Sequence, residues 1–127
     1  MTKKYNIAIV GATGAVGQMM IQVLLERKFP INELYLLASN KSDGKKINIL
    51  NKEFTVKALD GFDFSGIDIA LFSAGSNISE KYAKEATNKN SIVIDNTSFF
   101  RYEEDIPLIV PEINASQITH YKKTGII

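Results

Sequence analysis

The sequence has 127 residues, of which 45% are hydrophobic and 23% are charged, and its formal net charge is +1. This length suits one domain with a substantial core, and the balanced charge argues against a nucleic-acid partner. The sequence contains no cysteine, which excludes disulfides, thiolate metal sites and a cysteine nucleophile within these residues. The apolar N-terminal stretch is interrupted by glycines before a signal peptide or membrane span can form, so we expect a cytoplasmic protein with no membrane partner.

The first predicted elements are a strand, a glycine turn and a helix. Residues 7–10 are apolar, Gly11-Ala12-Thr13-Gly14-Ala15-Val16-Gly17 follows, and a helical pattern runs from residue 15 to about residue 28. Glycines permit a sharp turn and close ligand approach, and the helix N-terminus attracts a phosphate. This pattern predicts a pyrophosphate site, although a turn that binds nothing could share it. The helix should pack its apolar stripe against a sheet, through Val16, Met19, Met20, Val23 and Leu24.

The segment after the second predicted strand, residues 34–38, bears on which cofactor is bound. NAD-binding units usually place a carboxylate there for the ribose 2′-hydroxyl. This chain instead has Ser39-Asn40-Lys41-Ser42, whose hydroxyls and ammonium suit a 2′-phosphate. The segment favours NADP over NAD. Asp43 reduces the positive charge, and a solvated polar loop is the alternative.

A β-hairpin is predicted over residues 45–58, where apolar and polar residues alternate on either side of a turn at Asn51-Lys52. Its lysines are interspersed with carboxylates. We therefore expect a solvated sheet edge rather than a binding patch.

Another buried strand is predicted at residues 67–72, and it ends in the small residues Ser73-Ala74-Gly75-Ser76. Open α/β sheets bind their ligands at the carboxyl ends of strands, where small residues let a nucleotide lie against the backbone. The same residues can equally prepare a helix N-terminus. A helix should follow over about residues 78–89, with Asn77 and Glu80 at capping-box spacing.

The strand predicted at residues 91–94 leads into a polar stretch that contains Asn96 and Arg101. The planar guanidinium of Arg101 suits a phosphate or carboxylate, whereas the alternative is a surface ion pair with the acidic residues at 103–105. A strand over 108–114, a helix over 115–123 with Ile118 and Tyr121 facing inward, and the start of a strand at 125–127 should follow. The lone histidine, His120, lacks catalytic or metal-ligand partners in the sequence and is expected on the helix surface.

These elements together predict an α/β fold. The expected architecture is a Rossmann-like, doubly wound, mostly parallel sheet with a β-hairpin at one edge. Residues 1–127 should form a single NAD(P)-binding domain with no metal site.

Five motifs in order resemble the N-terminal, cofactor-binding part of the aspartate-semialdehyde dehydrogenase family: VGATGAVG, LASNKS, FSAGS, VIDNTSFFR and VPEIN. The resemblance extends over the whole chain. It implies NADP-dependent reduction of L-aspartyl 4-phosphate to L-aspartate 4-semialdehyde through a cysteine thioester. This reaction serves lysine, threonine, methionine and diaminopimelate biosynthesis, and the intact enzymes are usually homo-oligomers.

The resemblance also implies roles for individual residues. The cofactor phosphates would contact Gly11, Thr13, Gly14, Ala15 and Val16; the 2′-phosphate would contact Ser39, Lys41 and Ser42; and the cofactor cleft would be lined by Ser73, Ala74 and Gly75. Asn96 would lie near cofactor and substrate, and Arg101 would bind the substrate phosphate. Lys41 stands where many bacterial members have arginine, so a bidentate grip on the 2′-phosphate is lost.

The family's nucleophilic cysteine, acid–base histidine and second substrate arginine have no counterpart in the sequence. We therefore expect no catalytic residue and no dehydrogenase activity from these residues alone, because a C-terminal catalytic and dimerisation domain is absent. An exposed apolar patch and weak self-association should result. The alternatives are the cofactor domain of an N-acetyl-γ-glutamyl-phosphate reductase, which FSAGS and DNTSFFR fit less well, and a stand-alone nucleotide-binding module.

Overall fold

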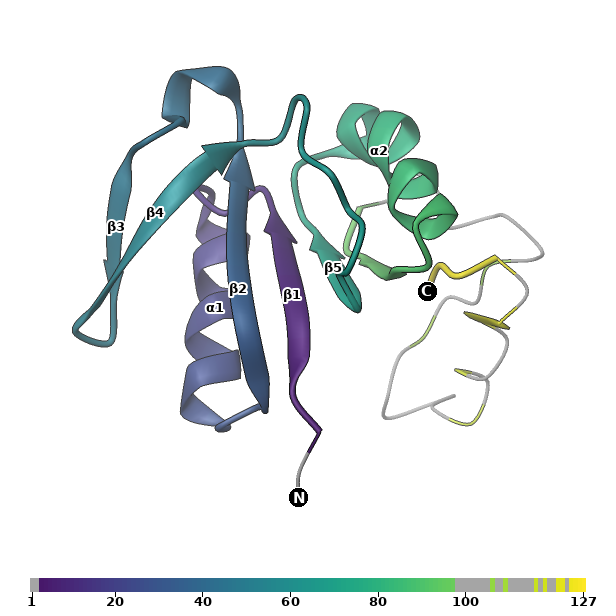
Figure 1. The fold of residues 1–127 in the computed structure, drawn as a ribbon, viewed down its shortest axis with the longest axis horizontal. Helices are drawn as coiled ribbons and strands as arrows, with labels where there is room; N and C mark the ends of the chain where they lie inside the picture. Colours follow the sequence, from purple (N-terminus) through teal and green to yellow (C-terminus); the bar gives the residue numbers. More distant parts are fainter. Residues whose placement is uncertain are drawn as a thin grey trace.

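The structure is a computed structural model that describes residues 3–97, 106, 109, 116, 118, 121, 122 and 124–127. In chain order its elements are β1 (Tyr5–Val10), α1 (Ala15–Glu26), β2 (Ile31–Ala38), the 3-10 turn η1 (Asn40–Ser42), β3 (Lys46–Ile49), β4 (Lys52–Ala58), β5 (Ile69–Phe72), α2 (Ser76–Asn88) and β6 (Ile92–Asp95). Six strands form one sheet in the order β3-β4-β2-β1-β5-β6 (Figure 1). The predicted Rossmann-like fold is confirmed.

The sheet is parallel except at the β3–β4 hairpin. Strand β1 is central and pairs in parallel with β2 on one side and β5 on the other. Strand β4 pairs antiparallel with β3 and in parallel with β2, so the predicted edge hairpin is confirmed and continues the main sheet. Across the hairpin Lys46 Nζ lies 3.0 Å from Glu53 Oε1, with both side chains exposed. The chain builds outward from β1 through β2 and β4 and then returns to β5, so a topological switch point lies between β1 and β5.

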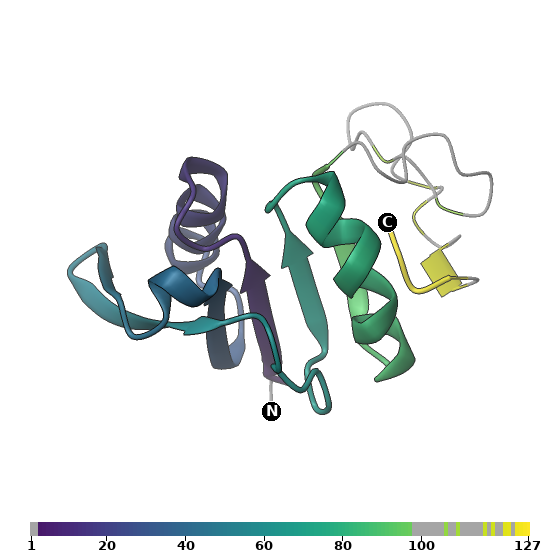
Figure 2. The ribbon, with the colours of Figure 1, turned by 90° about the horizontal axis from the view of Figure 1, so that it is seen from above.

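Alternate residues of the central strands face two separate cores. Ile7 and Ile9 of β1 pack with Ile21 of α1, while Ala8 and Val10 pack with α2. Two helices therefore cover opposite faces of the sheet, as expected for a doubly wound fold. In Figure 2, α1 and α2 lie on either side of the β1–β5 pair.

The ends of the two helices differ from the prediction. Helix α1 ends at Glu26, because Lys28 adopts a left-handed φ of 53° and Phe29 N–H donates to Leu24 O at 3.0 Å. This is a Schellman cap with lysine in the position that glycine usually occupies. Helix α2 begins at Ser76 with Gly75 as its N-cap, and no side chain caps it. The predicted capping box was wrong, because both of its residues lie inside the helix.

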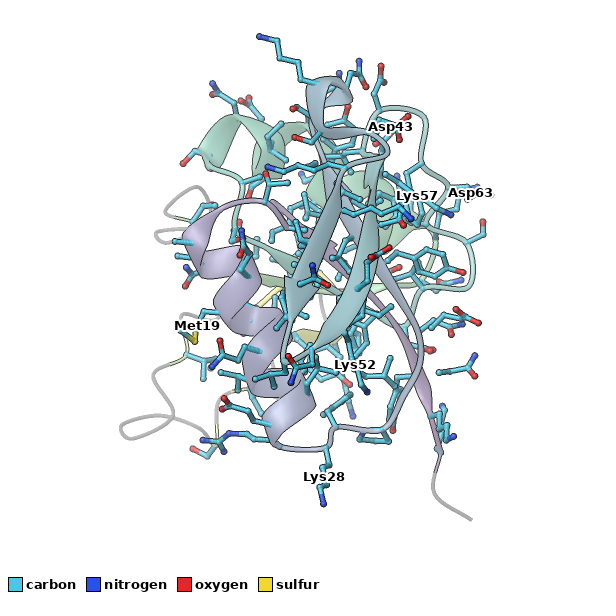
Figure 3. All side chains as sticks on the ribbon, turned by 90° about the vertical axis from the view of Figure 1, so that its left-hand side faces the viewer. Met19, Lys28, Asp43, Lys52, Lys57 and Asp63 are labelled. Atoms are coloured by element: carbon cyan, nitrogen blue, oxygen red, sulfur yellow. The ribbon has the colours of Figure 1, made fainter. Side chains whose placement is uncertain are left out.

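The predicted apolar stripe of α1 is only partly buried. Ile21 is fully buried, but Met19 is 55% exposed, Val16 47% and Val23 37%. Figure 3 shows Met19 pointing away from the sheet. The prediction that the whole stripe packs on the sheet was wrong, because Val16, Met19 and Val23 line an open apolar groove beside Leu71 of β5.

Several predicted features lie outside the described residues: Arg101, His120, and most of the strand and helix expected over 108–123. Ile118, which was expected to face inward, is 43% exposed, so that expectation was wrong. Ile126 is buried and forms an isolated parallel bridge with Val93, which places the C-terminal residues beside β6. Within the described ranges, no helix has the length and apolar character needed to cross a membrane.

Candidate functional site

The glycine turn between β1 and α1 requires glycine at two positions. Gly11 has a φ of +94°, and a Cβ there would lie 3.0 Å from Ala74 N and from the Ser73 carbonyl carbon. A Cβ at Gly17 would overlap the carbonyl oxygen of Gly11. The turn is therefore compact, with the start of α1 folded against the end of β1, and it is fixed by donation from Gly11 N–H to Leu37 O at 2.9 Å.

Gly14 has a different role in the same turn. It is exposed, has an ordinary φ of −77° and is the N-cap of α1. The first backbone N–H groups of a helix have no intrahelical acceptor. No side chain at Gly14 covers these donors, and the helix dipole adds a partial positive charge at this end of α1.

A pocket of about 580 Å³ opens at the carboxyl ends of β1, β2, β4 and β5. It is the position at which open α/β sheets bind ligands. Six residues of the predicted cofactor site line it: Gly11, Thr13, Gly14, Ser39, Ser73 and Ala74. Sequence reasoning missed other lining residues, which are Val10, Ala38, Asn40, Leu59, Asp60, Ile78, Lys81 and Tyr82.

Other predicted site residues lie outside this pocket: Ala15, Val16, Lys41, Ser42, Gly75 and Asn96. Ala15 and Val16 instead line an apolar groove along α1, together with Met19 and Leu71. Lys41 is exposed in η1. The backbone N–H of Asn96 donates to Phe72 O at 2.9 Å, so Asn96 lies next to the end of β5.

The turn after β2 is fastened to β4 by Asp43. Asp43 Oδ1 accepts a 3.0 Å hydrogen bond from the backbone N–H of Ala58. Ser42 N–H donates to Ser39 O at 2.9 Å, and Gly44 N–H donates to Val56 O at 2.8 Å. The carboxylate of Asp43 therefore anchors the segment that was predicted to bind the 2′-phosphate. Figure 3 shows Asp43 at the η1 end of the molecule.

Polar side chains join α2 to the end of β6. Asp95 Oδ1 accepts hydrogen bonds from the Ser79 hydroxyl at 3.0 Å and from Thr97 N–H at 2.8 Å. Thr97 Oγ1 donates to Ser79 Oγ at 3.1 Å. This network fixes the backbone on both sides of Asn96.

Lys81 and Asp60 supply the charges of the pocket lining. Lys81 Nζ lies 5.1 Å from the centroid of the Tyr82 ring. The pKa of Lys81 is raised, first by its contact with the Tyr82 side chain and then by the nearby carboxylates of Asp60 and Glu85. Lys81 is therefore cationic at neutral pH. Among the residues the structure describes, no group of three or more His, Cys, Asp or Glu side chains could hold a metal ion.

Comparisons with known proteins agree with this architecture. Residues 6–121 match the family model described as semialdehyde dehydrogenase, NAD binding domain. Aspartate-semialdehyde dehydrogenase of Rickettsia bellii is 53% identical over 127 residues, which is 100% of this chain and 38% of that protein. The crystal structure of aspartate semialdehyde dehydrogenase II from Vibrio cholerae, complexed with ASA, matches with a TM-score of 0.93 at 50% identity, over 98% of this chain and 41% of that chain.

A more distant structure shares the fold. Aspartate semialdehyde dehydrogenase with NADP from Candida albicans matches with a TM-score of 0.75 at 22% identity, over 94% of this chain and 36% of that chain. This chain therefore spans well under half the length of the relatives it matches. With residues 6–121 matched and the glycine turn in place, the chain belongs to the semialdehyde dehydrogenase family, as its NAD-binding domain.

Proposed function

We propose that residues 1–127 form the NADP(H)-binding domain of an aspartate-semialdehyde dehydrogenase. The observation that supports this most is the pocket at the topological switch point, which the glycine turn and the end of β2 line together. The complete enzyme would reduce L-aspartyl 4-phosphate to L-aspartate 4-semialdehyde in the cytoplasm, as a homo-oligomer. When bound, the nicotinamide ring supplies the hydride for this reaction.

The pyrophosphate of the cofactor would lie against the glycine turn. The backbone N–H groups of Thr13 and of the first helical residues, Ala15 and Val16, suit its oxygens. The side chains of Ala15 and Val16 face another groove, so their contribution would come from the backbone. Gly11 keeps the turn close to the end of β5, because a Cβ there would meet Ser73 and Ala74.

The 2′-phosphate would lie at the turn after β2. Ser39 lines the pocket and offers a hydroxyl donor. Ser42 and the exposed Lys41 lie one turn further along η1, within the same anchored segment. Since Asp43 is bonded to the backbone of β4, this segment has a defined position, which reduces the entropy lost on binding.

The remaining proposed contacts come from the residues that follow β5 and β6 in the chain. Ser73, Ala74 and Gly75 would border the cofactor cleft, since Ser73 and Ala74 line the pocket beside the glycine turn. Asn96 would lie between cofactor and substrate. Arg101, outside the described residues, would bind the phosphate of the substrate.

Titration of the purified chain with NADPH, followed by calorimetry, tests this proposal. Gly14 can be replaced without backbone strain, because its φ is −77° and the nearest atom to an added Cβ is 3.6 Å away. Asn and Asp are both good N-caps of similar size. Gly14→Asp places a negative charge at the pyrophosphate position, and Gly14→Asn is its uncharged control. We expect saturable binding by the wild type and at least about tenfold weaker binding by G14D than by G14N. A folded wild-type chain that binds no dinucleotide would refute the proposal.

A further inference from the structure

We propose that Lys81 contacts the 2′-phosphate of the dinucleotide from the α2 side of the pocket, and that Lys81 and Asp60 together set the preference between NADP and NAD. This inference rests on the proposed function and goes beyond it. The sequence pointed to Ser39, Lys41 and Ser42 for this phosphate, with Lys41 as the cation. The structure adds two residues from other elements.

The charges that border the pocket come from outside the β2 turn. Among the described residues that line it, Lys81 is the cation and Asp60 the anion, whereas Lys41 is not part of the lining. An ammonium next to the ligand attracts a phosphate more strongly than one held further out in water, because water and salt screen the longer interaction. Lys81 is therefore better placed than Lys41 to sense the extra phosphate.

Helix α2 places Lys81 at the border of the pocket. Ile78, Lys81 and Tyr82 are spaced three and four residues apart, so they share one face of the helix, and all three line the pocket. Tyr82 is only 7% exposed and belongs to the core, which gives the aliphatic stem of Lys81 a fixed neighbour. The ammonium itself remains at the solvent side of the pocket.

Asp60 indicates which end of the dinucleotide Lys81 would meet. Asp60 follows β4, which pairs with β2, the strand that leads into Ser39. The carboxylate of Asp60 attracts the ammonium of Lys81. Lys81 and Asp60 line the same pocket, and Asp60 lies on its β2–β4 side, where the 2′-phosphate would lie.

The pair would discriminate between the two cofactors by opposite effects. A 2′-phosphate would attract Lys81, and Asp60 would repel this phosphate. A 2′-hydroxyl would gain little from Lys81, but it could donate a hydrogen bond to Asp60. Removing the ammonium should therefore weaken NADP binding selectively, and removing the carboxylate charge should strengthen it selectively.

Titrations of NADPH and NADH at low ionic strength test the inference with three variants. Lys81→Met keeps an aliphatic stem and removes the charge, and Asp60→Asn is nearly isosteric. Lys84→Met is the matched control, because Lys84 is exposed on the same helix and does not line the pocket. We expect K81M to weaken NADPH by about five- to tenfold and NADH by less than about twofold. D60N should raise the NADPH-to-NADH affinity ratio, and K84M should leave the ratio unchanged.

Failure of the inference would differ from failure of the proposed function. Equal weakening of NADPH and NADH in K81M would show that Lys81 acts on phosphates common to both, and would overturn the inference. Wild-type affinities in K81M would overturn it as well, while the cofactor site itself would stand. If the folded wild-type chain bound neither dinucleotide, the proposed function would fail and the inference with it.

Discussion

The hydroxyl of Ser79 donates a 3.0 Å hydrogen bond to Oδ1 of Asp95, and this contact joins α2 to the end of β6. Ser79 is completely buried. The other carboxylate oxygen of Asp95 is buried without a hydrogen-bond partner among the described residues. A buried oxygen without a hydrogen-bond donor lowers the stability of the fold. The two hydrogen bonds to Oδ1 therefore provide much of the stabilisation where α2 meets β6.

Ser79→Ala should destabilise the fold by about 2 kcal/mol. The Asp95 carboxylate would lose the hydrogen bond from the Ser79 hydroxyl and, among the described residues, only the Thr97 N–H would still donate to it. Urea unfolding would show this as a lower midpoint with an unchanged slope. Glu80→Ala, at an exposed position on the same helix, is the control and should change stability by less than about 0.5 kcal/mol. Equal midpoints for S79A and the wild type would contradict the structural role of this bond.

Two substitutions at Asp43 distinguish the effect of its negative charge from the effect of its hydrogen bond to Ala58 N–H. If Asp43 acted only as a negative charge near a phosphate site, any neutral substitution would improve NADPH binding. In the structure its Oδ1 holds the backbone of Ala58, and the Oδ1 of an asparagine could do the same. We therefore expect Asp43→Asn to bind NADPH at least as tightly as the wild type, and Asp43→Ala to bind it several-fold more weakly.

Isothermal titration of both Asp43 variants measures this difference, with circular dichroism confirming the fold. Tighter NADPH binding by D43A than by D43N would contradict the anchoring role. The outcome bears on the proposed 2′-phosphate site, because Asp43 fixes the Ser39 to Ser42 segment relative to β4.

Local patterns in the sequence were enough to predict the glycine turn and the strands of the described sheet. The run from Ile7 to Val10 is apolar on both faces, which a parallel strand between two helices requires. Gly11 was recognisable because a positive φ at a strand-to-helix turn favours glycine. These features depend on residues that are neighbours in the chain.

Features that depend on distant residues could not be predicted. Lys81 and Asp60 lie 40 and 19 positions beyond Lys41, and only the sheet order brings them to the pocket. Helical spacing likewise identified the apolar stripe of α1, but not how much of it the sheet covers. The N-cap of α2 was misassigned because Gly75, which has a φ of 99° and no side-chain cap, begins the helix before the Asn77 signal.

The partial burial of α1 predicts unequal effects along one helix. Ile21 is fully buried, so Ile21→Ala should cost about 3 kcal/mol through lost burial and the cavity left behind. Met19 is 55% exposed, so Met19→Lys should change the free energy of unfolding by less than about 0.5 kcal/mol. Urea unfolding of the two variants measures the contrast. Comparable losses would mean that the face of α1 carrying Met19 is covered in solution.

Acid unfolding should reveal the contribution of Asp63. Its pKa is lowered mainly by the backbone N–H of Ser65 and then by the Ser65 side chain. A lowered folded-state pKa stabilises the fold above the unfolded-state pKa, and this stabilisation is lost as the pH falls through the folded-state value. Asp63→Asn should therefore make stability less dependent on pH below about pH 4. Unfolding midpoints of the wild type and D63N, measured at a series of acidic pH values, test this prediction. If both proteins lost stability equally as the pH fell, Asp63 would not be the group responsible.

The absence of cysteine from the sequence predicts that cofactor binding and turnover are separable in this chain. Reduction of an acyl phosphate through a thioester needs a thiolate nucleophile, and no other side chain forms that intermediate. We expect the purified chain to bind NADPH but to show no phosphate-dependent reduction of NADP when aspartate semialdehyde is supplied. Stopped-flow absorbance at high chain concentration would detect even a single turnover. NADPH binding is measured on the same sample, so a chain that binds NADPH without turnover lacks the nucleophile and is not misfolded. Measurable turnover would contradict the prediction, because the thioester mechanism does not provide it without a thiolate.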